Sequence, residues 1–97
     1  MTIEHIVMIE FKADTTEEQR AATMAELVAL KDKIPGIERS RVGMNYSDRA
    51  GKIELAAVMT LTDQAALDAY GPHPEHTAAV GRFVNYVEKL TVVDFVS

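Results

Sequence analysis

The most constraining feature of this sequence is a pair of segments, residues 3–11 and 52–61, that carry apolar side chains on both faces. Their residues alternate with a period of two, which predicts β-strands. Because the alternation does not separate an apolar face from a polar one, both faces of these strands are expected to be covered. One face carries Ile3, His5, Val7, Ile9 and Phe11 in the first segment and Ile53, Leu55, Ala57, Met59 and Leu61 in the second; the opposite faces include Ile6, Met8, Ala56 and Val58.

The other predicted elements follow in a recognisable order. The first helix is predicted from an apolar stripe at helical spacing and from a capping box formed by Thr15 and Glu18. The order βαββαβ is typical of an α+β, ferredoxin-like fold, with a four-stranded antiparallel sheet and helices on one face. We expect one domain over residues 1–97. The expected elements are a strand at 3–11, a helix at 16–33, strands at 37–46 and 52–61 joined by a hairpin loop at 47–51, a helix that runs from Thr62 or Asp63 to about Lys89 with a break near Pro72–Pro74, and a strand at 90–96.

Helices on one face of such a sheet leave its other apolar face without cover. We therefore expect a homodimer in which two sheets pack face to face. The alternative is a monomer that exposes an apolar patch of ligand size. Arg39 and Arg41 fit an exposed or edge strand at 37–46, and they are also candidates to receive an anionic group.

Composition and missing motifs exclude several classes of function. The chain has no cysteine, and 10 Lys+Arg against 15 Asp+Glu leave a net charge of −5, which disfavours nucleic-acid binding. Its longest uncharged run, residues 55–62, is too short to span a membrane, and its N-terminus has no signal-like segment. We expect a cytoplasmic protein with no membrane partner. No Gly-rich phosphate loop or serine-hydrolase elbow is present, so no cofactor is expected.

The most unusual stretch is residues 70–76, Tyr-Gly-Pro-His-Pro-Glu-His. If Pro74 begins a helix, His76 lies in its first turn, where the positive end of the helix dipole favours a neutral imidazole. A neutral imidazole suits a general base, and the Tyr70 hydroxyl can donate a hydrogen bond to a carbonyl that becomes an enolate. The two groups are the minimum set for removing a proton next to a carbonyl. The alternative is that both only satisfy backbone groups at a broken helix.

The other two histidines have less specific surroundings. His5 lies in an apolar row, where it is either a core histidine with a hydrogen-bond partner or a polar group of a cavity. His73 precedes Pro74, which favours an extended backbone and a place beside the helix N-cap. His73, Glu75 and His76 are close in sequence, but they do not provide three firm metal ligands in regular helical register. No metal is therefore expected.

Several motifs occur together along nearly the whole chain. They are Ile3-Glu-His5-Ile-Val, Phe11-Lys12, Ile34-Pro-Gly-Ile37, Gly43 with Asn45, Tyr70-Gly-Pro-His73-Pro-Glu-His76, and Val93-Asp94. In this combination the sequence resembles the stress-responsive A/B barrel family, also called Dabb, and the Y-x-x-H-P-x-H stretch is the most specific part. The resemblance implies a dimeric α/β barrel, in agreement with strands that are apolar on both faces.

The resemblance also implies a set of site residues. A plant enzyme of this family closes a linear polyketide thioester by intramolecular aldol condensation without a cofactor. Its catalytic histidine and tyrosine correspond to His76 and Tyr70, and a cavity histidine on its first strand corresponds to His5. A second cavity histidine corresponds to Leu55, so this chain lacks one polar group of that pocket. We place His5, Leu55 and His73 as the expected substrate-binding positions.

These observations lead to one functional expectation and two alternatives. We expect a pocket between sheet and helices that binds a small carbonyl-containing molecule, with cofactor-free proton transfer by His76 and Tyr70 of a cyclase or lyase type. The first alternative is a non-catalytic ligand-binding or stress-response protein. The second, suggested by the same barrel superfamily, is a cofactor-free monooxygenase-like protein.

Overall fold

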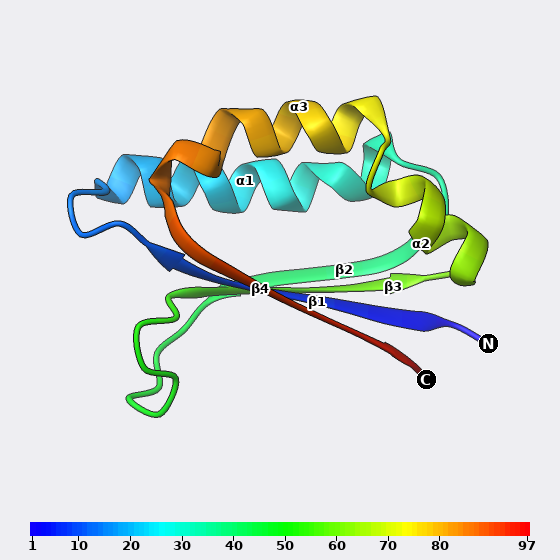
Figure 1. Ribbon diagram of the computed structural model, residues 1–97, viewed down its shortest axis with the longest axis horizontal. Coiled ribbons are helices and arrows are strands. Elements are labelled where there is room, and N and C mark those ends of the chain that lie inside the picture. The colour runs from blue at the N-terminus through cyan, green and yellow to red at the C-terminus, as the bar shows by residue number, and fades with distance from the viewer.

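The computed structural model describes residues 1–97 and contains the expected βαββαβ arrangement. Its four strands form one antiparallel sheet in the order β2-β3-β1-β4. Figure 1 shows α1 and α3 lying together over one face of this sheet, with no chain segment covering the other face in the same way. The elements are β1 (Ile3–Phe11), α1 (Glu17–Lys33), β2 (Ile37–Met44), β3 (Leu55–Leu61), α2 (Gln64–Tyr70), α3 (Pro74–Phe83), the 3-10 turn η1 (Val84–Tyr86) and β4 (Val87–Val96).

Four expected boundaries were wrong, namely the end of β2, the starts of β3 and β4, and the end of the last helix. The loop between β2 and β3 is longer than expected and spans residues 45–54, because the pairing of the two strands ends at Met44 and Leu55. Asn45 N–H donates to the Glu54 carbonyl at 2.8 Å at the base of this loop. The last helix ends at Phe83, and Val87 already pairs with Phe11 as part of β4. Local hydrophobic spacing could not show these boundaries, since they depend on pairing between segments that are distant in the sequence.

The capping box at the start of α1 is also one residue later than expected. The Thr16 hydroxyl accepts from Gln19 N–H at 3.1 Å, and the Gln19 side chain accepts from Thr16 N–H at 2.9 Å. Thr15, the expected cap, is instead buried, and its hydroxyl donates to the Tyr86 carbonyl. It therefore ties the start of α1 to the turn before β4.

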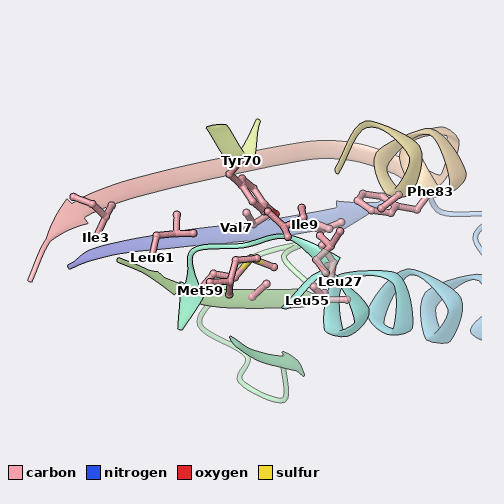
Figure 2. Packing of buried hydrophobic residues seen from close by; sticks show 14 of the residues in the cluster. Ile3, Val7, Ile9, Leu27, Leu55, Met59, Leu61, Tyr70 and Phe83 are labelled. Carbon is pink, nitrogen blue, oxygen red and sulfur yellow. The ribbon is translucent and has the colours of Figure 1, made fainter. Parts of the chain in front are cut away.

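The hydrophobic core lies between the sheet and the helices. Every second residue of β1 and β3 points into it, and these positions are buried on both strands. Leu27 and Leu30 of α1 and Phe83 of α3 close it from the other side, as Figure 2 shows for Leu27 and Phe83. Val28, an apolar residue of the same helix, is 52% exposed and does not belong to the core.

The opposite sheet face is apolar at its centre and has no covering layer. Ile6 lies between Val58 and Val93 in the strand register, and Met8 lies between Ala56 and Thr91. Phe95 and Val93 on β4 are 49% and 43% exposed. We call this surface the open face. Arg39 and Arg41 lie exposed on β2, which is an edge strand, as their polarity indicated.

No helix in the structure combines the length and apolar character needed to cross a lipid bilayer.

Candidate active site

A cavity of about 330 Å³ lies between the helix-covered sheet face and the helices. This volume is within the range of small-molecule sites, which is roughly 300–1,000 Å³. Its walls are mostly apolar and come from β1, β4 and all three helices, and three of its residues can exchange protons or donate hydrogen bonds: His5, Tyr70 and His76. A second, larger cleft near Glu10 and the 45–54 loop contains no histidine or tyrosine.

Tyr70 is the central group of this site. Its ring lies edge-on to His5, with 5.2 Å between the ring centroids, and tilted against His76 at 4.5 Å. The side chain is almost fully buried, and burial raises the pKa of the Tyr70 hydroxyl to about 12. The phenol therefore stays protonated at neutral pH, and no protein group accepts a hydrogen bond from it. It is available to donate to a molecule in the cavity.

The position of Tyr70 follows from the local sequence. Asp63 caps α2 by accepting from Ala66 N–H at 2.8 Å, and this seven-residue helix carries Tyr70 at its last position. Gly71 then ends the helix, and the chain turns back toward α3. Figure 2 shows the Tyr70 side chain descending from this helix end toward Val7 on β1.

His76 is held in one tautomer by the backbone. Its Nδ1 lies 2.8 Å from the Gly71 carbonyl oxygen, which can only accept, so Nδ1 carries the hydrogen. In the neutral ring the lone pair is therefore on Nε2. The residue is the third of α3, which begins at Pro74 as expected. A neutral imidazole with a free Nε2 is the form that a general base requires.

His5 is held by a residue that the sequence reasoning did not select as a site group. Asp94 lies opposite His5 in the pairing of β1 with β4, and its Oδ1 accepts from His5 Nδ1 at 2.5 Å. The His5 side chain is 10% exposed and that of Asp94 38%. The carboxylate fixes the orientation of the imidazole beside Tyr70. Asp94 appeared before only as part of a terminal motif, because the strand register that pairs it with His5 joins residues 89 positions apart.

Two of the expected substrate-binding positions do not line this cavity. Leu55 is fully buried in the core on β3, opposite Ile9, and Figure 2 shows it among the packed side chains. His73 is the N-cap of α3, and its Nδ1 accepts from Glu75 N–H at 3.1 Å. The structure thus brings together His5, Tyr70 and His76 but leaves Leu55 and His73 outside the cavity. No cluster of three metal-ligating side chains occurs in the structure.

The chain matches one protein-family model over almost its whole length. The family model described as "Stress responsive A/B Barrel Domain", Dabb, matches residues 3–97. The chain belongs to the Dabb family. The resemblance noted from the sequence motifs is confirmed, and the matched range includes every residue of the candidate site.

Relatives of this Dabb chain include one curated protein and several solved structures. A stress-response A/B barrel domain-containing protein of Arabidopsis thaliana is 25% identical in an alignment 97 positions long, which covers 98% of this chain and 37% of that protein. This chain therefore spans little more than a third of that relative. A dimeric ferredoxin-like protein of unknown function from Jannaschia sp. CCS1 is 30% identical, covers 100% of both chains and has a TM-score of 0.83. Hydroxynitrile lyase from Passiflora edulis, with a TM-score of 0.89 and 20% identity over 99% of this chain and 93% of its own, shares the fold.

Proposed function

We propose that this Dabb protein binds a small carbonyl compound in the 330 Å³ cavity and catalyses cofactor-free proton transfer on it. The observation that carries the proposal is the contact between a buried, protonated phenol and an imidazole whose Nε2 is free to accept a proton. These groups line a mostly apolar cavity, where each is more effective than in water.

The proposed step follows from the roles of the two groups. His76 Nε2 removes a proton from the carbon next to the substrate carbonyl. The electron pair of the broken C–H bond forms a C=C bond, and the carbonyl π electrons move to oxygen, which becomes an enolate. The Tyr70 hydroxyl donates a hydrogen bond to that oxygen as its charge develops. Return of a proton from His76 to the carbon completes an exchange. Alternatively, the enolate carbon attacks a second carbonyl, the π electrons of that carbonyl move to its oxygen, and His76 protonates the resulting alkoxide, which completes an aldol-type reaction.

His5 supplies the orientation of the substrate in this proposal. Because Asp94 accepts from its Nδ1, the imidazole cannot rotate freely, and its ring contacts the same Tyr70 that faces His76. The hydroxynitrile lyase from Passiflora edulis has the same fold, so this fold supports lyase chemistry in at least one other protein.

The working unit proposed here is a homodimer formed through the open face. The relatives from Jannaschia and from Thermobifida fusca, 30% and 26% identical, are both described as dimeric. The apolar centre of the open face, with Ile6 and Val93, is a surface that a second sheet would cover.

Deuterium exchange tests the chemistry without knowledge of the natural substrate. Uncharged 1,3-diketones, β-keto esters and aryl ketones are incubated in D₂O, and NMR follows loss of the α-proton signal relative to buffer. The wild-type protein should accelerate exchange for at least one compound, and His76→Ala should remove the acceleration because the base is gone.

The matched control is His73→Asn, which keeps an N-cap acceptor on α3 and leaves the cavity unaltered. This variant should exchange at the wild-type rate. Equal exchange by wild type and His76→Ala would refute the catalytic role. Binding of the same ketones without any exchange would instead support the non-catalytic alternative.

A further inference from the structure

The loop between β2 and β3, residues 45–54, extends beyond the sheet on the side away from the helices. Figure 1 shows it as the green segment below the strands, while α1 and α3 lie above them. We call this loop the hairpin arm. Tyr46 on the arm is 100% exposed, so its ring contacts nothing within its own chain. An aromatic side chain held entirely in water gains no stability from packing, and this is unusual for so ordered a segment.

The arm is held in a defined shape by its own hydrogen bonds. The Asn45 side chain donates to the carbonyls of Ser47 and Ile53 at 2.9 and 3.1 Å and so bridges the two sides of the loop. Ser47 N–H donates back to Asn45 Oδ1, and the Ser47 hydroxyl accepts from Arg49 N–H. These contacts fix the backbone on both sides of Tyr46. Binding through the arm would therefore lose little conformational entropy.

The arm and the open face together form a groove. It has a volume of about 470 Å³, and it is lined by Met8, Ala56 and Val58 from the open face and by Ala50 and Ile53 from the arm. The arm is thus continuous with the surface through which the homodimer is proposed to form.

We propose that the hairpin arm clasps a second copy of this chain and that Tyr46 is its main anchor. This inference rests on the homodimer proposed above, and it adds to that interface the loop that adjoins the open face. In a two-fold dimer the arm of each copy reaches the other copy, so the interface buries two Tyr46 side chains, one from each copy. Tyrosine is among the residues that most often dominate the affinity of an interface, since its ring brings a large contact area with few rotatable bonds.

Sedimentation equilibrium over a dilution series tests the proposal. The wild-type chain should dimerise, and Tyr46→Ala should raise the dimer Kd tenfold or more, whereas Tyr46→Phe, which keeps the ring, should stay within threefold of wild type. Val28→Ala is the matched control, because it removes apolar atoms from a 52% exposed position on α1, away from the open face. It should leave the Kd unchanged. Circular dichroism should show the same fold for every variant.

Met8→Glu separates failure of the arm from failure of the dimer, since it places a charge at the centre of the open face. If Met8→Glu is monomeric while Tyr46→Ala keeps the wild-type Kd, the dimer stands and the arm does not. If the wild-type chain is monomeric at a concentration on the order of 100 μM, both the dimer and the arm are refuted, and the open face belongs to another partner. Neither result affects the deuterium-exchange test of the cavity.

Discussion

Removing only the hydroxyl of Tyr70 should separate the chemistry of the cavity from the stability of the fold. The ring is buried between His5 and His76, but its hydroxyl forms no hydrogen bond with the protein. Tyr70→Phe keeps the ring and its packing, so the free energy of unfolding should change by no more than about 0.5 kcal/mol. The same variant removes the donor to the developing enolate, and the exchange rate should fall by a factor of roughly 10²–10³.

Truncation to alanine provides the opposite pattern. Tyr70→Ala removes a buried aromatic ring and enlarges the adjoining cavity, so unfolding should become easier by about 3–5 kcal/mol. In a domain of this size such a loss lowers the Tm by more than about 12 °C. Urea unfolding followed by circular dichroism measures both variants, and the deuterium-exchange assay is run on the same samples below the unfolding transition.

Two results would refute this reasoning. If Tyr70→Phe exchanges α-protons at the wild-type rate, the phenol does not stabilise an enolate. If Tyr70→Phe loses more than about 1.5 kcal/mol of stability, the hydroxyl has a structural partner in solution, and its role as a free donor is wrong.

Two further predictions concern stability. The pKa of Tyr70 is raised to about 12 from an ordinary value of 10, so the folded state favours the neutral phenol. The stability that this preference contributes is present below pH 10 and is lost as the pH rises through 12. In urea unfolding across that pH range, the wild-type protein should therefore lose up to about 3 kcal/mol of stability relative to Tyr70→Phe. Parallel pH profiles of the two proteins would contradict it. Gly36→Ala should destabilise the fold by about 2–4 kcal/mol, since Gly36 has φ +94° and an added Cβ would lie 2.8 Å from that of Ala66. Gly51→Ala, with φ +63° and open space around it, should lose only about 1–2 kcal/mol, and equal losses would show that contact with α2 is unimportant.

The order of the elements could be predicted because it depends on local patterns. The alternation in residues 3–11 requires only neighbouring positions to specify a strand, and β1 has those bounds. Pro74 likewise begins α3, where its missing N–H needs no partner. The first residues of β3 and β4 could not be predicted, since each is set by pairing with a distant segment.

The candidate site was predictable in part for the same reason. Tyr70 and His76 lie six residues apart, and the turn between them brings their rings together. The partner of His5 was not predictable, because Asp94 meets it only through the β1–β4 register. Leu55 was expected in the pocket by correspondence, but its side chain is enclosed by the core.

The sequence by itself determined that this chain forms strands with two apolar faces, which a helix layer on one face cannot cover completely. Periodicity and side-chain type are properties of single segments, so they can be read without the tertiary structure. Only the tertiary structure decided which groups meet: the carboxylate that holds His5, the carbonyl that sets the tautomer of His76, and the arm that extends beyond the open face. Those contacts depend on strand register and helix packing, which no local sequence pattern specifies.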